Sequence, residues 1–455
     1  MSTRSGEHAA ASRPATGLPP AGQDAGDRRR RPGLRVRLGL LSQRDFRLLW
    51  IGESASSLGS SVTSVALPLA AVTVLDASPL AVSLLAAAAW LPWLLIGLPA
   101  GVWVDRLSRR RVMLAADWAS LAAFLSIPSA AALGVLTVGH LIVVALAAGT
   151  AKVFFATAYR AYLPTLVDTS DLLEANAKLQ GSEQAANLAG PGVAGLLAQV
   201  FSALGGLLVD AASFAVSAIC LMRIRHAETG TRGPRRRLRS QIREGLRLVS
   251  RDRLLRGNTL YGCAANLALT GYQSLIVVFL VTDIGFAPGQ IGVLMAATSL
   301  GGITGAALAR PLAARLGSAR AVLVAKVGLA PFGLLIPLAD RELGIALFIL
   351  GSIVIIGGIV AGNVVFSGFV QGYVPGELMG RVTTSIQVVN YGAIPLGALL
   401  AGTLAELFGV RTALWTMMAV FVASGMILLV TLGRRRDLPT GGLVLADDIP
   451  PAERR

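Results

Sequence analysis

Glu53, Lys152 and Asp117 are among the ionisable residues that stand inside long apolar stretches of this chain. A charged side chain in a hydrocarbon environment is costly, so each of these residues is a candidate for function. A carboxyl group held away from water binds a proton more readily, whereas a nearby ammonium group favours the carboxylate. Glu53 and Lys152 stand at matched depths in their runs and could together take up and release protons. A permanent ion pair that merely neutralises two buried charges is an equal alternative.

A second concentration of charge lies in a short turn between two apolar runs. The turn reads G-V-W-V-D-R-L-S-R-R-R and places one acid before four arginines. Carboxylates and guanidinium groups make charge-assisted hydrogen bonds, so this turn could hold neighbouring helix ends together. A basic loop that only fixes membrane topology is the plainer alternative. The candidate residues are Gly101, which we expect to end the first helix, and Asp105, Arg106, Arg109, Arg110 and Arg111.

The runs around these residues are long enough to cross a membrane. Hydrophobic residues make up 54% of the 455 residues and charged residues only 15%, a composition too apolar for an ordinary soluble protein. An apolar helix of roughly 18 residues or more spans the ~30 Å bilayer core. We therefore expect an all-α membrane protein with twelve transmembrane helices, at residues 48–75, 80–104, 112–133, 138–159, 179–203, 204–222, 257–281, 288–309, 321–338, 343–369, 382–408 and 412–432.

The distribution of basic residues predicts the orientation of these spans. An even number of spans puts both termini on one side, and loops on the cytoplasmic side carry an excess of Lys and Arg. With a cytoplasmic N-terminus, only Arg341 and Arg411 of the 41 Lys and Arg fall in outer loops. We expect an N-in, C-in, multi-pass protein of the plasma or inner cell membrane.

Composition divides the chain into five segments. Residues 223–256 contain twelve arginines, and the spacing of apolar residues in 238–255 predicts an amphipathic helix on the inner membrane surface. A solvated charge run is an equal alternative. The segments are a disordered basic tail (1–44), a six-helix half (45–222), a basic cytoplasmic linker (223–256), a second six-helix half (257–433) and a cytoplasmic tail (434–455).

The second half repeats the first in the same orientation. At an offset of 209 residues, Pro79 matches Pro288 and Arg106 matches Arg315, but Asp105 becomes Ala314. Parallel repeats of this kind occur in transporters whose substrate site lies at the interface between the halves. The charged turn is therefore more complete in the first half.

The turn resembles the G-x-x-x-D-R/K-x-G-R-R/K loop between helices 2 and 3 of the major facilitator superfamily, with Ser108 where Gly is usual. The segment Tyr159–Pro164, followed by Leu172–Ala177, resembles the branch that includes macrolide-efflux and siderophore-exporter permeases. The resemblance implies a major facilitator fold in which helices 1, 4, 7 and 10 line a central cavity and the turn gates its cytoplasmic side.

We also predict partners for the charged turn and for the acid near it. We expect Asp105 to accept hydrogen bonds from free N–H groups at the start of helix 11, near Val382. The arginines should then engage acids of the next inner loop, namely Asp168, Asp171 or Glu174, and Asp117 should pair with Arg160 or with the turn arginines.

The fifth apolar run carries a motif of small residues. The stretch Asn187–Gly195 resembles the exporter signature G-P-x-x-G-G, with Ala194 in place of one glycine. Proline removes a backbone hydrogen bond and glycine allows close helix contact, so Gly190, Pro191 and Gly195 could form a bending point. Ordinary helix packing is the alternative.

Polar and aromatic residues of the other runs are candidate lining for the cavity. Hydrogen bonding between helices is the plainer explanation for any one of them, and we interpret Asp210, near an outer end, as a boundary residue. The candidates are Phe155, Asn187, Asn266, Tyr272, Gln273, Asn363, Asn390 and Tyr391.

Several classes of function are disfavoured. The net charge of +16 lies between apolar runs rather than on a folded basic face, which argues against nucleic-acid binding. There is no G-x-x-x-x-G-K-[ST] motif for ATP. Cys220 and Cys263 lack metal-ligand spacing, and no nucleophile with a base and an orienting group can be recognised. We expect no enzyme activity, no metal and no cofactor.

We therefore expect a monomeric secondary exporter of an apolar or amphiphilic small molecule, such as a drug, a macrolide-like natural product or a siderophore. Proton antiport with alternating access would drive export, and its partners would be substrate, protons and the lipid bilayer. An importer on the same fold is one alternative. A non-transporting membrane scaffold or sensor, with the basic linker as its partner-binding element, is another.

Overall fold

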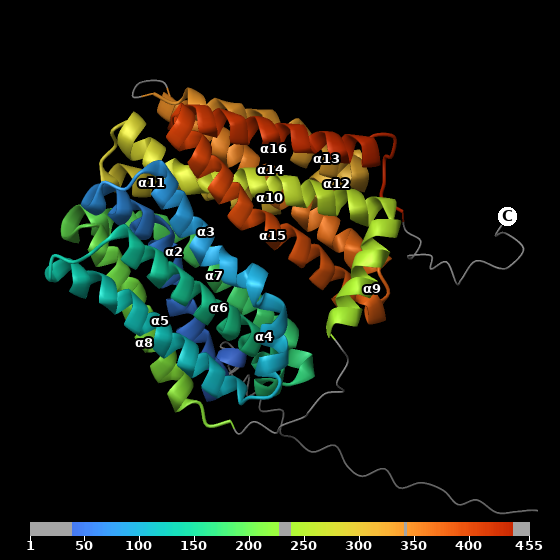
Figure 1. The fold of residues 1–455 in the computed structure, drawn as a ribbon. Helices are drawn as coiled ribbons and strands as arrows, with labels where there is room; N and C mark the ends of the chain where they lie inside the picture. Colours follow the sequence, from blue (N-terminus) through green and yellow to red (C-terminus); the bar gives the residue numbers. More distant parts are fainter. Residues whose placement is uncertain (1–38, 227–237, 341–343, 440–455) are drawn as a thin grey trace, which may run out of the picture.

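The computed structural model describes residues 39–226, 238–340 and 344–439. Within these ranges the chain forms helices and no strand, which confirms the all-α expectation (Figure 1). The α-helices are α2 (Arg44–Leu75), α3 (Pro79–Leu95), α4 (Gly97–Val104), α5 (Arg109–Ala132), α6 (Val138–Leu166), α7 (Leu172–Phe201), α8 (Ala203–Arg223), α9 (Leu238–Arg251), α10 (Arg253–Val278), α11 (Pro288–Thr298), α12 (Leu300–Leu316), α13 (Ser318–Leu323), α14 (Gly344–Tyr373), α15 (Gly376–Phe408) and α16 (Val410–Leu432).

Ten helical segments of the described ranges are long and apolar enough to cross a membrane. They make this a multi-pass membrane protein. Two of the predicted spans are not among the ten. Residues 80–104 are divided between α3 and α4. The predicted span 179–203 lies in α7 as far as Phe201, and this helix of 30 residues also carries Glu174, Lys178 and Glu183.

Proline accounts for two of the interruptions in the predicted helices, whereas a third, at Ser299 between α11 and α12, has no proline beside it. The expected single helix at 80–104 breaks at Ile96, because Pro99 has no N–H to donate to the carbonyl of Leu95. The expected helix at 321–338 is also not continuous. After α13 it passes through the π-helical turn η4 (Val324–Gly328) into the 3₁₀-helix η5 (Ala330–Leu338), which holds Pro331 and Pro337.

The ordered chain begins before its first long helix. Residues 39–44 were expected to be disordered, but Gly39–Ser42 form the 3₁₀-helix η1. Leu40 is only 3% exposed, and its N–H donates a 3.1 Å hydrogen bond to Glu174 Oε1 at the start of α7. The rest of the predicted tail, residues 1–38, lies outside the described residues, as do residues 227–237 of the linker.

Hydrogen bonds between helix ends define one end of the bundle, which we call the arginine-rich end. Arg109 at the start of α5 donates to the carbonyl of Ala161 near the end of α6, at 3.0 Å. Arg253 at the start of α10 donates to the carbonyl of Val430 near the end of α16, at 2.8 Å. The opposite end holds the turn before α3, where the side chain of Ser78 caps the helix.

The helices α2 to α8 form a first set, and the helices α10 to α16 form a second set. The two sets meet where α3 packs against α15 and where α7 packs against α11 (Figure 1). At the opposite end, a Cβ on Gly402 would lie 2.5 Å from Ser83 Cβ. Farther along, Tyr391 of α15 packs edge-on against Trp90 and Trp93 of α3, with centroids 5.7 and 5.8 Å apart. These contacts fasten the sets together from the opposite end to the middle of the bundle.

At the arginine-rich end the sets are not fastened in this way. A Cβ placed on Gly101 of α4 or on Gly380 of α15 would meet nothing within 4 Å. Asp105 and Arg106 are exposed. The helix α9 packs here on the second set, where Glu244 forms an ion pair with Arg381 at the start of α15.

Candidate functional site

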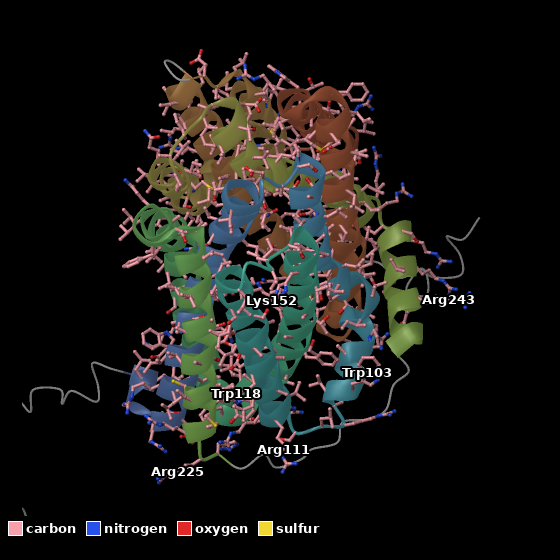
Figure 2. All side chains as sticks on the ribbon, turned by 60° about the vertical axis from the view of Figure 1, so that its left-hand side comes forward. Trp103, Arg111, Trp118, Lys152, Arg225 and Arg243 are labelled. Carbon is pink, nitrogen blue, oxygen red and sulfur yellow. The ribbon has the colours of Figure 1, made fainter. Side chains whose placement is uncertain are left out.

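A group of ionisable side chains lies inside the first set of helices. Glu53 of α2 is half-buried, and its Oε2 is buried without a hydrogen-bond partner. Lys152 of α6 and Glu183 of α7 are both exposed, yet both are close enough to influence Glu53 electrostatically. In Figure 2, Lys152 lies deeper in the bundle than Arg111 at the arginine-rich end. The structure therefore brings charged side chains of α6 and α7 within electrostatic range of Glu53 on α2.

The expected direct contact between Glu53 and Lys152 is absent. No nitrogen–oxygen distance between them is within 4.0 Å, although both residues are described. Matched depth along two helices does not specify which way each side chain points around its helix axis, and this is why the pairing was wrong. Lys152 also acts electrostatically on Asp210 of α8, so its charge influences two acids rather than one.

Asp117 also has a different neighbour from the predicted one. It is 2% exposed on α5, and its Oδ2 has no hydrogen-bond partner. The side chain beside it is Ser217 of α8, and Glu53 is within electrostatic range. The expected pairing with Arg160 or with the turn arginines is wrong, because Asp117 faces α8 two turns into α5, away from the helix end.

Asp210 is a structural member of this group that sequence reasoning missed. It is 1% exposed, accepts a 2.6 Å hydrogen bond from Thr63 Oγ1 of α2, and accepts another at 3.2 Å from Ser213 Oγ. It is not a boundary residue. The sequence shows an acid in an apolar run at this position, but it does not indicate which residue of another helix will donate a hydrogen bond to that acid.

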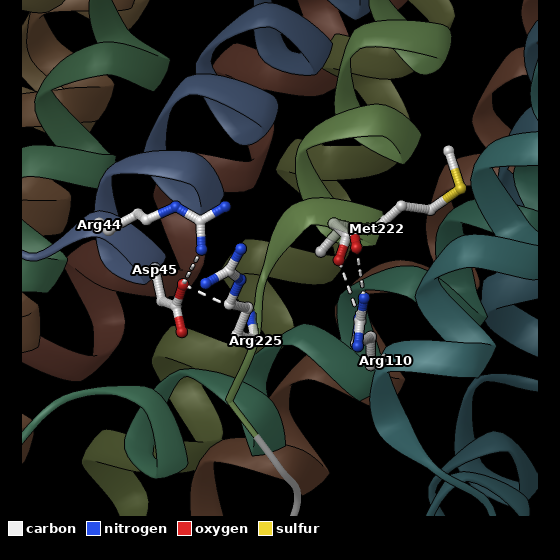
Figure 3. A network of polar contacts seen from close by, with 6 residues as sticks. Arg44, Asp45, Arg110, Met222 and Arg225 are labelled. Carbon is white, nitrogen blue, oxygen red and sulfur yellow. Dashed lines mark hydrogen bonds and ion pairs between the residues drawn. The ribbon is translucent and has the colours of Figure 1, made fainter.

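The charged turn fastens helix ends within the first set. Arg110 donates 2.8 and 2.7 Å hydrogen bonds to the carbonyls of Leu221 and Met222, the last turn of α8 (Figure 3). The α8 carbonyls are unpaired at a helix end, so a guanidinium group is a suitable partner. Beside them, Asp45 Oδ1 accepts from the N–H of Arg225, at 3.4 Å (Figure 3).

The predicted partners of Asp105 are not in place. Asp105 follows the last residue of α4, its side chain is exposed, and Val382 lies inside α15, which begins at Gly376. The N–H of Val382 is therefore not a free helix-start group. Gly101 also lies inside α4 rather than ending it. Glu174, expected to meet the turn arginines, instead binds the Leu40 N–H and Lys178.

The small-residue motif of α7 lies at two close helix contacts. A Cβ on Gly190 would lie 2.3 Å from Ser61 Cβ of α2, and one on Gly195 would lie 2.5 Å from Gly292 Cα of α11. Pro191, between them, is buried. The glycines thus allow α7 to approach a helix of its own set and a helix of the other set at the same time.

The candidate cavity residues divide into two groups. Tyr272 is buried next to Ser352, and Asn390 faces Gly262 across the contact between α15 and α10. These two lie within helix contacts. The others are exposed or half-buried, and Asn187 also accepts a 2.9 Å hydrogen bond from Ser61. This second group consists of Phe155, Asn187, Asn266, Gln273, Asn363 and Tyr391.

Trp90 and Trp93 are aromatic neighbours of Tyr391 that the sequence did not single out. Both lie on α3, whose aromatic residues look like ordinary apolar residues of a span. Together with Tyr391 they form an aromatic cluster between the two sets, at the point where the contacts between α3 and α15 give way to the open arginine-rich end. Such a cluster suits a flat apolar ligand.

Comparison with known proteins agrees with this arrangement. The sequence profile of the transmembrane secretion effector family, a family of the major facilitator superfamily, matches residues 37–439. The multidrug efflux pump Tap of Mycolicibacterium fortuitum is 27% identical over 407 residues, covering 86% of this chain and 96% of Tap.

Solved transporters share the fold. The nucleoside transporter NupG is 13% identical and superposes with a TM-score of 0.72, covering 86% of this chain and 100% of NupG. A bacterial homologue of the iron transporter ferroportin, in its inward-facing state, is 15% identical with a TM-score of 0.67, covering 86% of this chain and 99% of that one. At these identities the likeness concerns the fold alone.

Proposed function

Because this chain belongs to the transmembrane secretion effector family of the major facilitator superfamily, we propose that it exports an apolar or amphiphilic small molecule in exchange for protons. It is a transporter and not an enzyme, with efflux pumps among its relatives. The name of Tap as a multidrug efflux pump supports the outward direction and the substrate class. A drug, a macrolide-like natural product or a siderophore fits that class.

The observation that carries proton coupling is the buried, unpartnered Oε2 of Glu53. A carboxylate oxygen without a hydrogen-bond donor is costly to keep charged, so protonation offers an alternative state. Lys152 is within electrostatic range but does not form an ion pair that would hold the carboxylate permanently. Water or substrate entering beside Lys152 would shift the balance between the two states of Glu53, as proton exchange requires.

Alternating access is supported by where the two sets of helices meet. They are fastened from the opposite end to the aromatic cluster and not at the arginine-rich end. The positive-inside rule would put the arginine-rich end in the cytoplasm, with twelve spans and both termini inside. This conformation would then be open inward, ready to receive substrate from the cytoplasm, with one six-helix half (45–222) moving against the other (257–433).

The charged turn would act as the cytoplasmic gate when the halves close. Arg109 and Arg110 already hold the ends of α6 and α8, which leaves Asp105 exposed and available for a partner. The first two N–H groups of α15, those of Gly376 and Glu377, precede the first N–H that bonds to the Pro375 carbonyl, and they are the groups a carboxylate would bind. This corrected partner replaces Val382.

The substrate would bind between the aromatic cluster and the polar residues of the two sets. Trp90, Trp93 and Tyr391 offer ring faces and edges, while Asn363 and Gln273 offer hydrogen-bonding groups. Large apolar contacts with few polar ones are typical of sites for amphiphilic compounds.

The proposal is tested with purified protein in proteoliposomes loaded with a pH-sensitive dye. A panel of apolar cationic dyes, macrolides and siderophores is added on the side of the arginine-rich end, and proton movement is followed as substrate is transported. Coupled movement of substrate and protons in opposite directions is expected, and a protonophore should abolish accumulation. Substrate transport that leaves the internal pH unchanged would reject proton antiport, and accumulation in the reverse direction would favour an importer.

A further inference from the structure

A small cavity lies at the arginine-rich end of the second set of helices, away from the proposed transport path. Its volume is about 460 Å³, and it opens between the start of α10 and the end of α16, which run side by side (Figure 1). The lining residues are Arg253, Leu429, Val430, Thr431, Arg434 and Arg435. Three of the six are arginines, so the cavity concentrates positive charge.

The arginines of this cavity have no acidic partner among the described residues. Arg253 donates to the carbonyl of Val430, at 2.8 Å, and none of the three takes part in an ion pair. Asp437, two residues after Arg435, accepts a 2.9 Å hydrogen bond at its Oδ1 from the Ser318 N–H. The acid nearest to Arg253 along the chain, Asp252, is also engaged. Its Oδ1 accepts from the N–H groups at the start of α10, and its Oδ2 accepts a 2.8 Å hydrogen bond from Tyr373.

The surface beside the cavity is apolar and exposed. Leu429 and Val430 line the cavity and are 40% and 71% exposed, and Met426, one turn back along α16, is 59% exposed. Leu260 of α10 is 51% exposed. In a membrane-spanning bundle, such an apolar surface next to arginines marks the level where lipid chains give way to head groups.

We propose that this cavity binds the phosphate head group of an anionic phospholipid, with the acyl chains lying along α16. Arginine binds phosphate oxygens through two parallel hydrogen bonds, and three arginines without acids leave positive charge for a negatively charged lipid. Basic pockets between helices on the cytoplasmic side of membrane proteins bind such head groups. The exposed apolar residues of α16 favour a lipid over free phosphate, which has no acyl chain to place there.

A lipid bound here would fasten three helix ends of the second set. Arg253 would connect the head group to the start of α10, and Arg434 and Arg435 would connect it to the end of α16. The start of α10 is already linked to the end of α14, because Tyr373 donates a hydrogen bond to Asp252. The bound head group would therefore stabilise the second set as a rigid body. This role does not depend on the identity of the transported substrate.

The test is a titration of the full-length protein, purified in a zwitterionic detergent, with short-chain phosphatidylglycerol, short-chain phosphatidylcholine and inorganic phosphate. The thermal unfolding midpoint reports binding. Phosphatidylglycerol should raise it saturably, whereas phosphatidylcholine and phosphate should not at the same concentrations. The double variant Arg434→Gln and Arg435→Gln should bind phosphatidylglycerol about 25-fold more weakly, at roughly one fivefold step per arginine.

The matched control removes two other exposed arginines from the same set, Arg315→Gln with Arg320→Gln, and should bind phosphatidylglycerol as the parent does. Equal stabilisation by inorganic phosphate would overturn the lipid assignment in favour of a free anion. Equal stabilisation by phosphatidylcholine would reject a charged head-group site. Binding that appears only after deletion of residues 440–455 would show that this C-terminal segment, which carries Asp447 and Asp448, is the occupant instead. The comparisons of phosphatidylglycerol with phosphatidylcholine and with phosphate use the parent protein, in which all arginines are present. Misfolding of a Gln variant therefore cannot decide the outcome.

Discussion

Thr63 Oγ1 donates a 2.6 Å hydrogen bond to Asp210 Oδ2, and this contact joins α2 to α8 inside the first set of helices. Asp210 is 1% exposed, so its oxygens have no water to replace a lost donor. Ser213 supplies a second hydrogen bond to the other oxygen. The pair is therefore a stabilising link between the first and last helices of the set.

Replacing Thr63 with Val should lower the free energy of unfolding by about 1–3 kcal/mol, because Asp210 Oδ2 would remain buried without its donor. Thermal unfolding of the purified protein measures the effect. The matched control is Thr73→Val on the same helix, where the hydroxyl bonds only the carbonyl of Leu69 and the side chain is exposed. Equal shifts in the two variants would mean that the Asp210 contact contributes nothing specific.

Replacing Gly195 with Ala should disrupt the contact between α7 and α11. A Cβ there would lie 2.5 Å from Gly292 Cα, and backbone atoms cannot move aside as a flexible side chain can. Overpacking of this kind costs about 1–3 kcal/mol, which would favour conformations in which the opposite end is open. Distances between spin labels at that end should lengthen.

Gly192→Ala is the control for this experiment, since its Cβ would lie 3.5 Å from Ala296 Cβ, an ordinary contact. It should leave the distance distribution as in the parent. An unchanged distribution in Gly195→Ala would show that the tight glycine contact does not limit the movement of the two sets.

Replacing Glu53 with Gln should abolish substrate-driven proton movement while substrate binding persists. The Gln amide has nearly the shape of the carboxyl group, but it does not bind or release protons at the pH values of the transport assay. Proton flux in proteoliposomes and substrate binding to the same preparation are measured together. Glu406→Gln, an exposed acid of α15, should behave as the parent. Proton exchange that survives in Glu53→Gln would direct attention to Asp117, the other buried acid with an unpartnered oxygen.

Replacing Asp105 with Asn should favour the inward-open conformation without preventing insertion. The exposed carboxylate would lose its charge, and with it the attraction to the free N–H groups at the start of α15. Cysteine labelling from the cytoplasmic side should become faster and transport slower. Asp283→Asn, an exposed acid near the opposite end, should change neither. The gate assignment is wrong if the labelling and transport rates of Asp105→Asn equal those of the parent.

Acidification should release the segment that precedes α2. The hydrogen bond from Leu40 N–H, with a smaller contribution from Lys178, lowers the pKa of Glu174 below its ordinary value. A lowered folded-state pKa means that the contact stabilises the fold above the ordinary glutamate value of about 4.3. That stabilisation is lost as the pH falls through the lower, folded-state value.

Hydrogen exchange at the Leu40 amide measures this release, with Glu174→Gln as the comparison. In the parent, protection of the Leu40 amide should decrease as the pH falls through the folded-state pKa of Glu174. The measured rates are first corrected for the pH dependence of intrinsic amide exchange. Protection in Glu174→Gln should show no such step, because the amide oxygen does not titrate. An identical pH profile for both proteins would remove Glu174 from the anchoring of residues 39–42.

The positions of helices were predictable because they depend on local composition. Among the described residues, each predicted apolar run is mostly helical, since only a helix satisfies the backbone hydrogen bonds of such a run in lipid. The interruptions at Ile96 and after Leu323 were not predicted, although Pro99 and Pro331 were visible in the sequence. Proline can kink a helix or end it, and which occurs depends on the neighbours that satisfy the freed carbonyls.

The contacts of the candidate site were much less predictable. Glu53, Asp117 and Lys152 could be identified as charges inside apolar runs, but two of the expected pairs did not form. Depth in a run gives the height of a residue along its helix. The direction of its side chain depends on the rotation of that helix, which packing against several other helices decides.

By itself the sequence determined that this is a multi-pass helical membrane protein, which residues carry charge into its apolar runs, and that the arginines gather at one end of the helices. These are properties of single segments and of the order in which they follow one another. Only the tertiary structure decided that Asp210 faces Thr63, that Trp90 and Trp93 meet Tyr391, and that the two sets meet at the end away from the arginines. These contacts join residues far apart in the chain. They depend on the simultaneous packing of many helices, because each rotation is fixed only when all its neighbours are in place.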